Sequence, residues 1–169
     1  MTRRGEKRLE ITAAVLTVSD SSARGTRIDA SGPAVKALLE RNNFRVIATA
    51  IMADEQPAIE KAILEMASQA QLVVTTGGTG IAERDVTPEA TRAVCSRMVD
   101  GVAERMRAVG SQTTPLAALS RAVCGVCGRA LVLNLPGSPQ AATESLSAVL
   151  DLLPHALGLL AGDTSHSDH

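Results

Sequence analysis

The feature that most constrains this chain is a short apolar run that leads into a glycine-rich loop and then a proline. Leu72–Thr76 is apolar and β-branched, which predicts a buried strand. Gly77-Gly78-Thr79-Gly80 follows at once, and its glycines permit backbone angles and close approaches that a Cβ forbids. Farther on, Thr87 and Pro88 predict a helix start, with Thr87 as N-cap and Pro88 at the first helical position.

This strand–loop–helix arrangement is typical of an anion site, because free N–H groups converge at a helix N-terminus. The same segment contains Asp85, a carboxylate that would repel a bound phosphate. A cation between the two would remove this repulsion. The sequence therefore indicates a phosphate-containing ligand with a divalent metal ion.

Composition excludes several classes of function. The chain has 169 residues, 45% of them apolar, which suits one globular domain. Its only aromatic residue is Phe44, so it has no platform for stacking single-stranded nucleic acid. A net charge of −1 argues against non-specific binding to DNA. We expect no nucleic-acid partner.

The ends of the chain are polar and are expected to be flexible tails, residues 1–11 and 163–169, around a single domain of residues 12–162. The basic run Arg3, Arg4, Lys7 and Arg8 is interpreted as part of a solvated tail. No apolar signal segment follows it, and no stretch is apolar for the length of a bilayer. These observations predict a cytoplasmic protein without a membrane partner.

The remaining pattern alternates strands and helices. Strands are predicted at residues 12–18, 44–52, 72–76, 122–127 and 130–135, and the last two are expected to form a hairpin around Gly128. Helices are predicted to start at Ser31, Pro57, Pro88, Pro139 and Pro154; the third is expected to run through Met98, and a further helix carries Val102 and ends at Gly110. Residues 19–25 and 111–120 are expected to be loops, the second with at most one helical turn. This order predicts an α/β fold: a three-layer α/β/α sandwich with a mostly parallel sheet and a short antiparallel hairpin.

Polar residues follow four of the predicted strands. They are Ser19-Asp20, Asp54-Glu55-Gln56, the glycine loop with Asp85, and the turn Asn134–Ser138. In parallel sheets, ligands bind outside the carboxyl ends of the strands. We therefore expect all four segments to lie along one edge of the sheet.

Comparison with common nucleotide-binding and catalytic motifs excludes some kinds of site and leaves others open. The glycine loop lacks the Lys-Ser/Thr of a P-loop and the spacing of a dinucleotide fingerprint. Asp54 and Asp85 at neighbouring strand ends suit Mg²⁺ that also contacts substrate phosphates. The alternative is that each aspartate merely caps or braces the helix that follows it. All three histidines lie beyond residue 154, so none is well placed as the base for a Ser or Cys nucleophile.

Three cysteines form no disulfide framework. Cys124 and Cys127 have C-x-x-C spacing, but they fall in a predicted strand, and a zinc site would need more ligands than Cys95 can supply. They are interpreted as buried structural thiols.

Six motifs together resemble the MoaB/Mog family, the molybdopterin adenylyltransferases of molybdenum cofactor biosynthesis. They are Thr17-Val18-Ser19-Asp20, Asp54-Glu55-Gln56, Thr75-Thr76-Gly77-Gly78-Thr79-Gly80, Arg84-Asp85-Val86-Thr87-Pro88-Glu89-Ala90-Thr91, Leu119-Ser120-Arg121 and Asn134-Leu135-Pro136-Gly137-Ser138-Pro139. Each motif is weak alone, but six in order from about Ala13 to about Leu160 are specific.

The resemblance implies a molybdopterin-binding-domain-like fold and a reaction. The terminal phosphate of molybdopterin attacks the α-phosphate of ATP, and pyrophosphate leaves. It implies that Asp54 and Asp85 are catalytic and hold Mg²⁺, and that the backbone of Gly77, Gly78, Thr79 and Gly80 contacts phosphate. It also implies a molybdopterin-facing wall and a region near the nucleotide; the wall comprises Ser120, Arg121, Pro136, Gly137 and Ser138, and the nucleotide region comprises Ser19, Asp20 and Ser31-Gly32.

The resemblance further implies a homotrimer or a hexamer built from trimers, with handover of the product to a molybdate-insertion protein. Two alternatives stay open. One is a non-catalytic molybdopterin carrier or scaffold of the same fold, against which the presence of both Asp54 and Asp85 counts. The other is molybdate insertion itself, which resembles the work of a larger family with additional domains.

Overall fold

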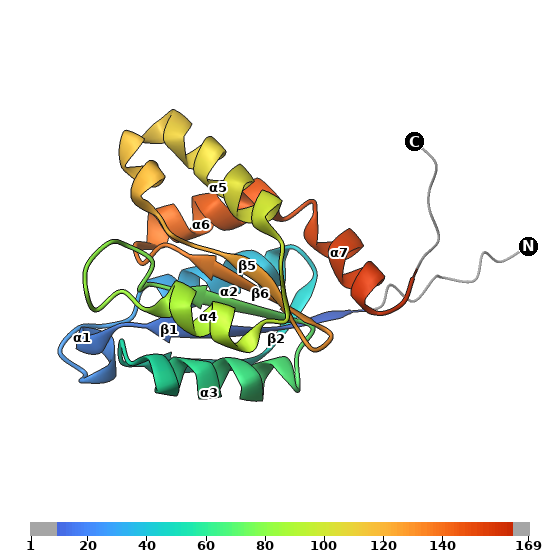
Figure 1. Ribbon diagram of the computed structural model, residues 1–169, viewed down its shortest axis with the longest axis horizontal. Coiled ribbons are helices and arrows are strands. Elements are labelled where there is room, and N and C mark those ends of the chain that lie inside the picture. Colours follow the sequence, from blue (N-terminus) through green and yellow to red (C-terminus); the bar gives the residue numbers. More distant parts are fainter. Residues whose placement is uncertain (1–9, 164–169) are drawn as a thin grey trace, which may run out of the picture.

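A computed structural model describes residues 10–163, which fold around one six-stranded sheet with the strand order β2-β1-β3-β6-β5-β4. Helices cover both faces of the sheet, which gives three layers (Figure 1). The predicted α/β/α sandwich is thereby confirmed. Within the described residues, no helix is both long and apolar enough to cross a membrane.

The first four strands of the sheet order are parallel, and the other end of the sheet is antiparallel. β1 pairs in parallel with β2 and β3, and β3 pairs in parallel with β6. The β5–β6 hairpin and the β4–β5 pair are antiparallel, as expected for the hairpin. The strands are β1 (Ile11–Val18), β2 (Phe44–Met52), β3 (Leu72–Thr76), β4 (Arg97–Met98), β5 (Cys124–Cys127) and β6 (Ala130–Leu135).

Each face of the sheet has its own apolar core. On one face, side chains such as Val15, Val74 and Leu133 pack against α2, α5, α6 and α7. On the other, Leu16 and Val73 pack against α3 and α4. The helices are α1 (Asp20–Ala23), α2 (Ser31–Arg41), α3 (Gln56–Ala67), α4 (Thr87–Val94), α5 (Asp100–Thr113), the 3-10 helix η1 (Pro115–Leu119), α6 (Pro139–Val149) and α7 (Leu153–Leu160).

The structure corrects four local predictions. Residues 19–25, expected to be a loop, contain α1, because the Ser19 side chain accepts from the Ser22 N–H and caps a short turn. The helix predicted through Met98 ends at Val94, and Arg97–Met98 forms β4 against β5. α5 continues past Gly110 to Thr113.

The fourth correction concerns the start of α4. Val86 is its N-cap and Thr87 its first residue, so Thr87 is not the cap. Its Oγ1 is instead buried and has no hydrogen-bond partner among the described residues.

The predicted tails fall mostly outside the part of the chain that the structure describes. Residues 1–9, with the basic run, and residues 164–169 lie outside it. Of the predicted N-terminal tail, Ile11 already belongs to β1.

The two cysteines of the C-x-x-C sequence lie on opposite faces of β5. Cys124 packs in the core beneath α5 and α6, and Cys127 packs in the core beneath α3 and α4. Burial raises the pKa of the Cys124 thiol to about 12, and it also raises the pKa of Cys127. Both are free thiols, which matches their interpretation as structural residues.

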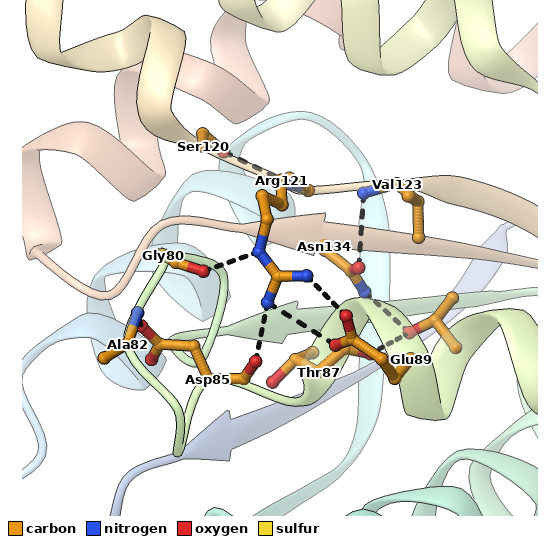
Figure 2. Close-up of polar contacts among 11 residues, drawn as sticks. Gly80, Ala82, Asp85, Thr87, Glu89, Ser120, Arg121, Val123 and Asn134 are labelled. Atoms are coloured by element: carbon orange, nitrogen blue, oxygen red, sulfur yellow. Dashed lines mark hydrogen bonds and ion pairs between the residues drawn. The ribbon is translucent and has the colours of Figure 1, made fainter.

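One buried polar side chain ties the sheet to its surroundings. Asn134 on β6 is fully buried. Its Nδ2 donates to Thr75 Oγ1 at 3.0 Å and to Thr91 Oγ1 at 2.9 Å, and its Oδ1 accepts from the Val123 N–H at 3.3 Å. Asn134 therefore connects β6 to β3, to α4 and to the segment before β5. Figure 2 shows its bonds to α4 and to Val123.

We expect Asn134→Leu to lower the free energy of unfolding by about 2–4 kcal/mol, because buried polar groups lose their partners while the volume is kept. Urea denaturation would measure this. Asn42→Leu is the matched control, since the Asn42 side chain bonds only the Leu38 carbonyl at an exposed helix end; its effect should stay within about 1 kcal/mol. Equal effects of the two substitutions would contradict a connecting role for Asn134.

Candidate active site

The four polar segments that follow strands meet at one edge of the sheet, as expected. β1, β2, β3 and β6 end level with one another, with Val18 beside Met52 and Thr76 beside both Thr17 and Leu135. The segments beyond them surround a polar pocket of about 330 Å³. Its lining includes the sequence-predicted residues Ser19, Ser31, Asp54, Gly77, Gly78, Asp85, Gly137 and Ser138.

Backbone geometry explains why the first two positions of the loop are glycine. Gly77 and Gly78 have φ values of +89° and +66°, which favour glycine. A Cβ on Gly77 would lie 2.2 Å from the Val18 carbonyl oxygen, and one on Gly78 would lie 2.3 Å from Thr87 Oγ1. The Gly77 N–H donates to the Leu135 carbonyl at 3.0 Å. This bond corrects the expectation that Gly77 offers its N–H to a phosphate, because the sheet already uses it.

Asp54 is held by main-chain bonds from the neighbouring strand end. The Asp20 N–H donates to Asp54 Oδ2 at 2.9 Å, and the Asp54 N–H donates to Asp20 Oδ1 at 2.9 Å. Burial raises the pKa of the Asp54 carboxyl, and the charges of Asp20 and Asp85 raise it further, while the bond from Asp20 opposes them. Asp54 is thus a partly buried carboxylate beside two others.

Asp85 reaches the same pocket from the glycine loop. Its Oδ2 accepts from the Ala82 N–H at 3.0 Å, and its own N–H donates to the Ala82 carbonyl at 3.0 Å. Neither aspartate caps the helix that follows it: Glu55 and Val86 occupy those N-cap positions, and neither makes a side-chain cap bond. The two aspartates therefore do not cap these helices, and the bracing part of the alternative is not decided by these bonds.

Asp54 and Asp85 supply only part of the ligands that a metal ion needs. Among residues 10–163, no group of three or more His, Cys, Asp or Glu side chains is placed to hold a metal ion. Mg²⁺ normally takes one or two carboxylates and completes its shell with water and substrate phosphates. Asp54 and Asp85 line one pocket and repel each other. They therefore suit a Mg²⁺ site with two protein carboxylates, in which water and substrate phosphates supply the other ligands.

A second, mainly apolar pocket of about 440 Å³ adjoins the first. Gly137 and Ser138 line both pockets, so the turn after β6 forms their common wall. Thr79, Gly80, Ser120 and Pro136 line the second pocket only, with Ala103 and Met106 of α5 and Leu116 and Leu119 of η1.

Two predicted site residues turn toward other protein groups. Asp20 accepts two bonds from the Arg84 guanidinium, at 2.9 and 2.7 Å, and these bonds lower the pKa of the Asp20 carboxyl. The Arg121 guanidinium is directed at the glycine loop and Glu89 (Figure 2). Neither residue is among those that line the two pockets.

Asp29 is a site residue that the sequence analysis missed. It lines the polar pocket, and its carboxylate accepts from Thr17 Oγ1 at 2.7 Å, from the Gly32 N–H at 3.1 Å and from Ser31 Oγ at 3.3 Å. An aspartate just before a Ser-Gly-Pro helix start could have signalled these bonds. Ser31 and Gly32, expected near the nucleotide, lie beside it.

Comparison of the sequence with known proteins identifies a family and several relatives of this chain. The family model described as a probable molybdopterin binding domain matches residues 14–155. A molybdopterin adenylyltransferase of Helicobacter pylori is 40% identical over 153 residues, which cover 88% of this chain and 87% of that protein. One of Haemophilus influenzae is 42% identical over 142 residues, covering 81% and 72%.

A solved structure gives the same result. The molybdopterin biosynthesis enzyme MoaB of Thermus thermophilus superimposes with a TM-score of 0.85 at 51% identity, and the match covers 90% of this chain and 97% of that one. The resemblance carried by the six motifs is thus confirmed over most of the chain. This protein therefore belongs to the molybdopterin-binding domain family of molybdenum cofactor biosynthesis.

Proposed function

We propose that this protein is a molybdopterin adenylyltransferase that uses ATP and Mg²⁺. An oxygen of the molybdopterin terminal phosphate forms a bond to the α-phosphorus of ATP. The bond between that phosphorus and the oxygen that bridges to the β-phosphorus breaks, and pyrophosphate leaves. The names and coverage of the adenylyltransferase relatives support this assignment.

The observation that carries the proposal is the pair of pockets with a common wall. The polar pocket contains Asp54 and Asp85 and suits a charged triphosphate, while the mainly apolar pocket suits a flat organic ring system. Substrates bound in the two pockets would come together beside Gly137 and Ser138, which line both. Holding both reactants in place supplies much of the rate in phosphoryl-type transfer.

The proposed roles follow from these positions. Asp54 and Asp85 would hold Mg²⁺, and the bound ion would offset the charge of the substrate phosphates. Backbone N–H groups of Gly78, Thr79 and Gly80 steady the charge that develops on the transferred group. Ser120, Pro136, Gly137 and Ser138 contact molybdopterin. Ser19 and Ser31, which also line the polar pocket, are assigned to contacts with the nucleotide.

We also propose a homotrimer, or a hexamer built from trimers, that passes its product to a molybdate-insertion protein in the cytoplasm. In support, the edge strand β2 exposes Ile47 and Ile51, and α3 and α7 expose Leu64 and Leu159. An edge strand with exposed apolar side chains, such as β2, can pair with another copy of the chain. Light scattering should give three or six times the mass of one chain; the mass of one chain would refute the proposal.

Pyrophosphate release is the test of the function. Purified protein should release pyrophosphate from ATP only when both molybdopterin and Mg²⁺ are present, and EDTA should abolish the release. Molybdopterin binding without release would instead make the protein a carrier.

Asp85→Asn separates chemistry from binding. It removes the charge but keeps an acceptor for the Ala82 N–H, so we expect turnover to fall by about 10²–10³-fold and molybdopterin affinity to change by less than about threefold. Asp151→Asn, on an exposed aspartate that pairs with Arg105, is the control and should retain full activity. Loss of molybdopterin binding in Asp85→Asn would mean that Asp85 has a structural role.

The raised pKa of Asp54 predicts an acid limit to activity. Burial and the neighbouring carboxylates favour the protonated form, so Asp54 takes up its proton at a higher pH than an ordinary aspartate. The value of kcat/KM for ATP should therefore fall as pH decreases through this raised pKa. The residual activity of Asp54→Asn should lack this limb; an unchanged profile in the variant would assign the limb to another group.

A further inference from the structure

Arg121 connects two parts of the molecule that are distant in sequence. It lies between η1 and β5, and its main-chain N–H donates to the Thr79 carbonyl at 2.8 Å. Its Nε donates to the Gly80 carbonyl at 2.7 Å, and its Nη2 donates to the Asp85 carbonyl at 2.6 Å. Its Nη1 forms an ion pair with the carboxylate of Glu89 on α4. Figure 2 shows this guanidinium between the start of the loop, Asp85 and α4.

The segment from Gly80 to Val86, called here the Asp85 loop, joins the glycine loop to α4, where Val86 packs against the core and the Thr87 N–H donates to the Gly78 carbonyl. Residues 81–84 are exposed, and Ile81 exposes 71% of its surface. Within the loop, Asp85 and Ala82 bond one another, and outside it Arg84 pairs with Asp20 through a side chain that is itself 61% exposed. The Arg84 pair is bidentate, but it holds the loop only through the Arg84 side chain and does not bond the loop backbone. Arg121 is thus the cation that bonds the loop backbone directly at Asp85.

The geometry of these bonds requires an arginine. Two main-chain carbonyls and one carboxylate lie around a single planar group, and the guanidinium offers donors in a fixed fork. The ammonium group of a lysine is a compact charge that cannot reach all three acceptors in the same way. The resemblance alone implies that Arg121 contacts molybdopterin, but the guanidinium donors are directed at the loop, and only its neighbour Ser120 lines the apolar pocket.

We propose that Arg121 is a positioning residue: it holds the Asp85 loop so that the Asp85 carboxylate stays at the polar pocket. Since Ser120 is adjacent, the same short segment bounds one pocket and fixes the acidic residue of the other. This inference rests on the proposed function for its effect on turnover, but the order of the loop does not depend on which reaction is catalysed.

The first arm of the test needs no substrate. Hydrogen exchange should be at least tenfold faster for the amides of Ala82 and Asp85 in Arg121→Gln than in the unmodified protein, while amides of β3 and β6 keep their protection. Arg105→Gln is the matched control, because Arg105 forms an exposed ion pair with Asp151 away from both pockets. It should leave exchange in the Asp85 loop unchanged.

The second arm measures turnover. For Arg121→Gln, kcat should fall about tenfold to a hundredfold, while KM for ATP and for molybdopterin changes by less than about threefold. Arg121→Lys should recover only part of the loss, and Glu89→Gln, which keeps both carbonyl bonds, should lose less than either. These two variants also serve if Arg121→Gln folds poorly.

Two results would overturn the proposal. A raised KM for molybdopterin with normal exchange in the Asp85 loop would show that Arg121 contacts substrate. Faster exchange with unchanged kcat would show that the position of the loop does not matter to the reaction. If the unmodified protein proves inactive, the proposed function fails, and the exchange arm still decides whether Arg121 holds the loop.

Discussion

The main-chain hydrogen bonds of β1 to β2 and β3, and of β3 to β6, fix where the polar segments of the candidate site begin. They bring four strand ends level, although these ends come from widely separated parts of the chain. The pairing continues one residue beyond the strands, since the Ser19 N–H donates to the Met52 carbonyl and the Gly77 N–H to the Leu135 carbonyl. The pocket therefore begins at a rigid edge, and the loops that follow start from fixed positions.

Polar groups at this edge divide into two kinds. Asp20, Arg121 and Asn134 bond other protein groups and stabilise the arrangement. Asp54 and Asp85 reach the pocket, and the main-chain N–H groups of Asp20 and Ala82 orient their carboxylates. Two carboxylates held close in a partly buried place repel each other, which favours a cation between them. The structure thus concentrates negative charge where a charged substrate and its counter-ion would have to enter.

Strong local signals predicted the strands, the glycine loop and the common edge of the site. The buried runs at β1, β3 and β6 are apolar and β-branched, and parallel pairing then places Asp54 and Asp85 together. β4 could not be predicted, because its two residues form a strand only by pairing with β5, and Cys95 packs where Gly125 has no side chain. The direction of Arg121 was equally hidden, since a long side chain can reach several acceptors and only the folded loop selects them.

The position of β6 between β3 and β5 has a consequence for how the chain folds during its synthesis. β3 is entirely buried in the folded chain, yet one of its edges pairs with β6, which is encoded much later. During synthesis the apolar strand Leu72–Thr76 stays open on that edge until residues 130–135 have left the ribosome. The wall that the two pockets share, Gly137 and Ser138, follows directly. Until β6 pairs with β3, the growing chain exposes an unpaired apolar strand edge, which is the kind of edge that favours aggregation.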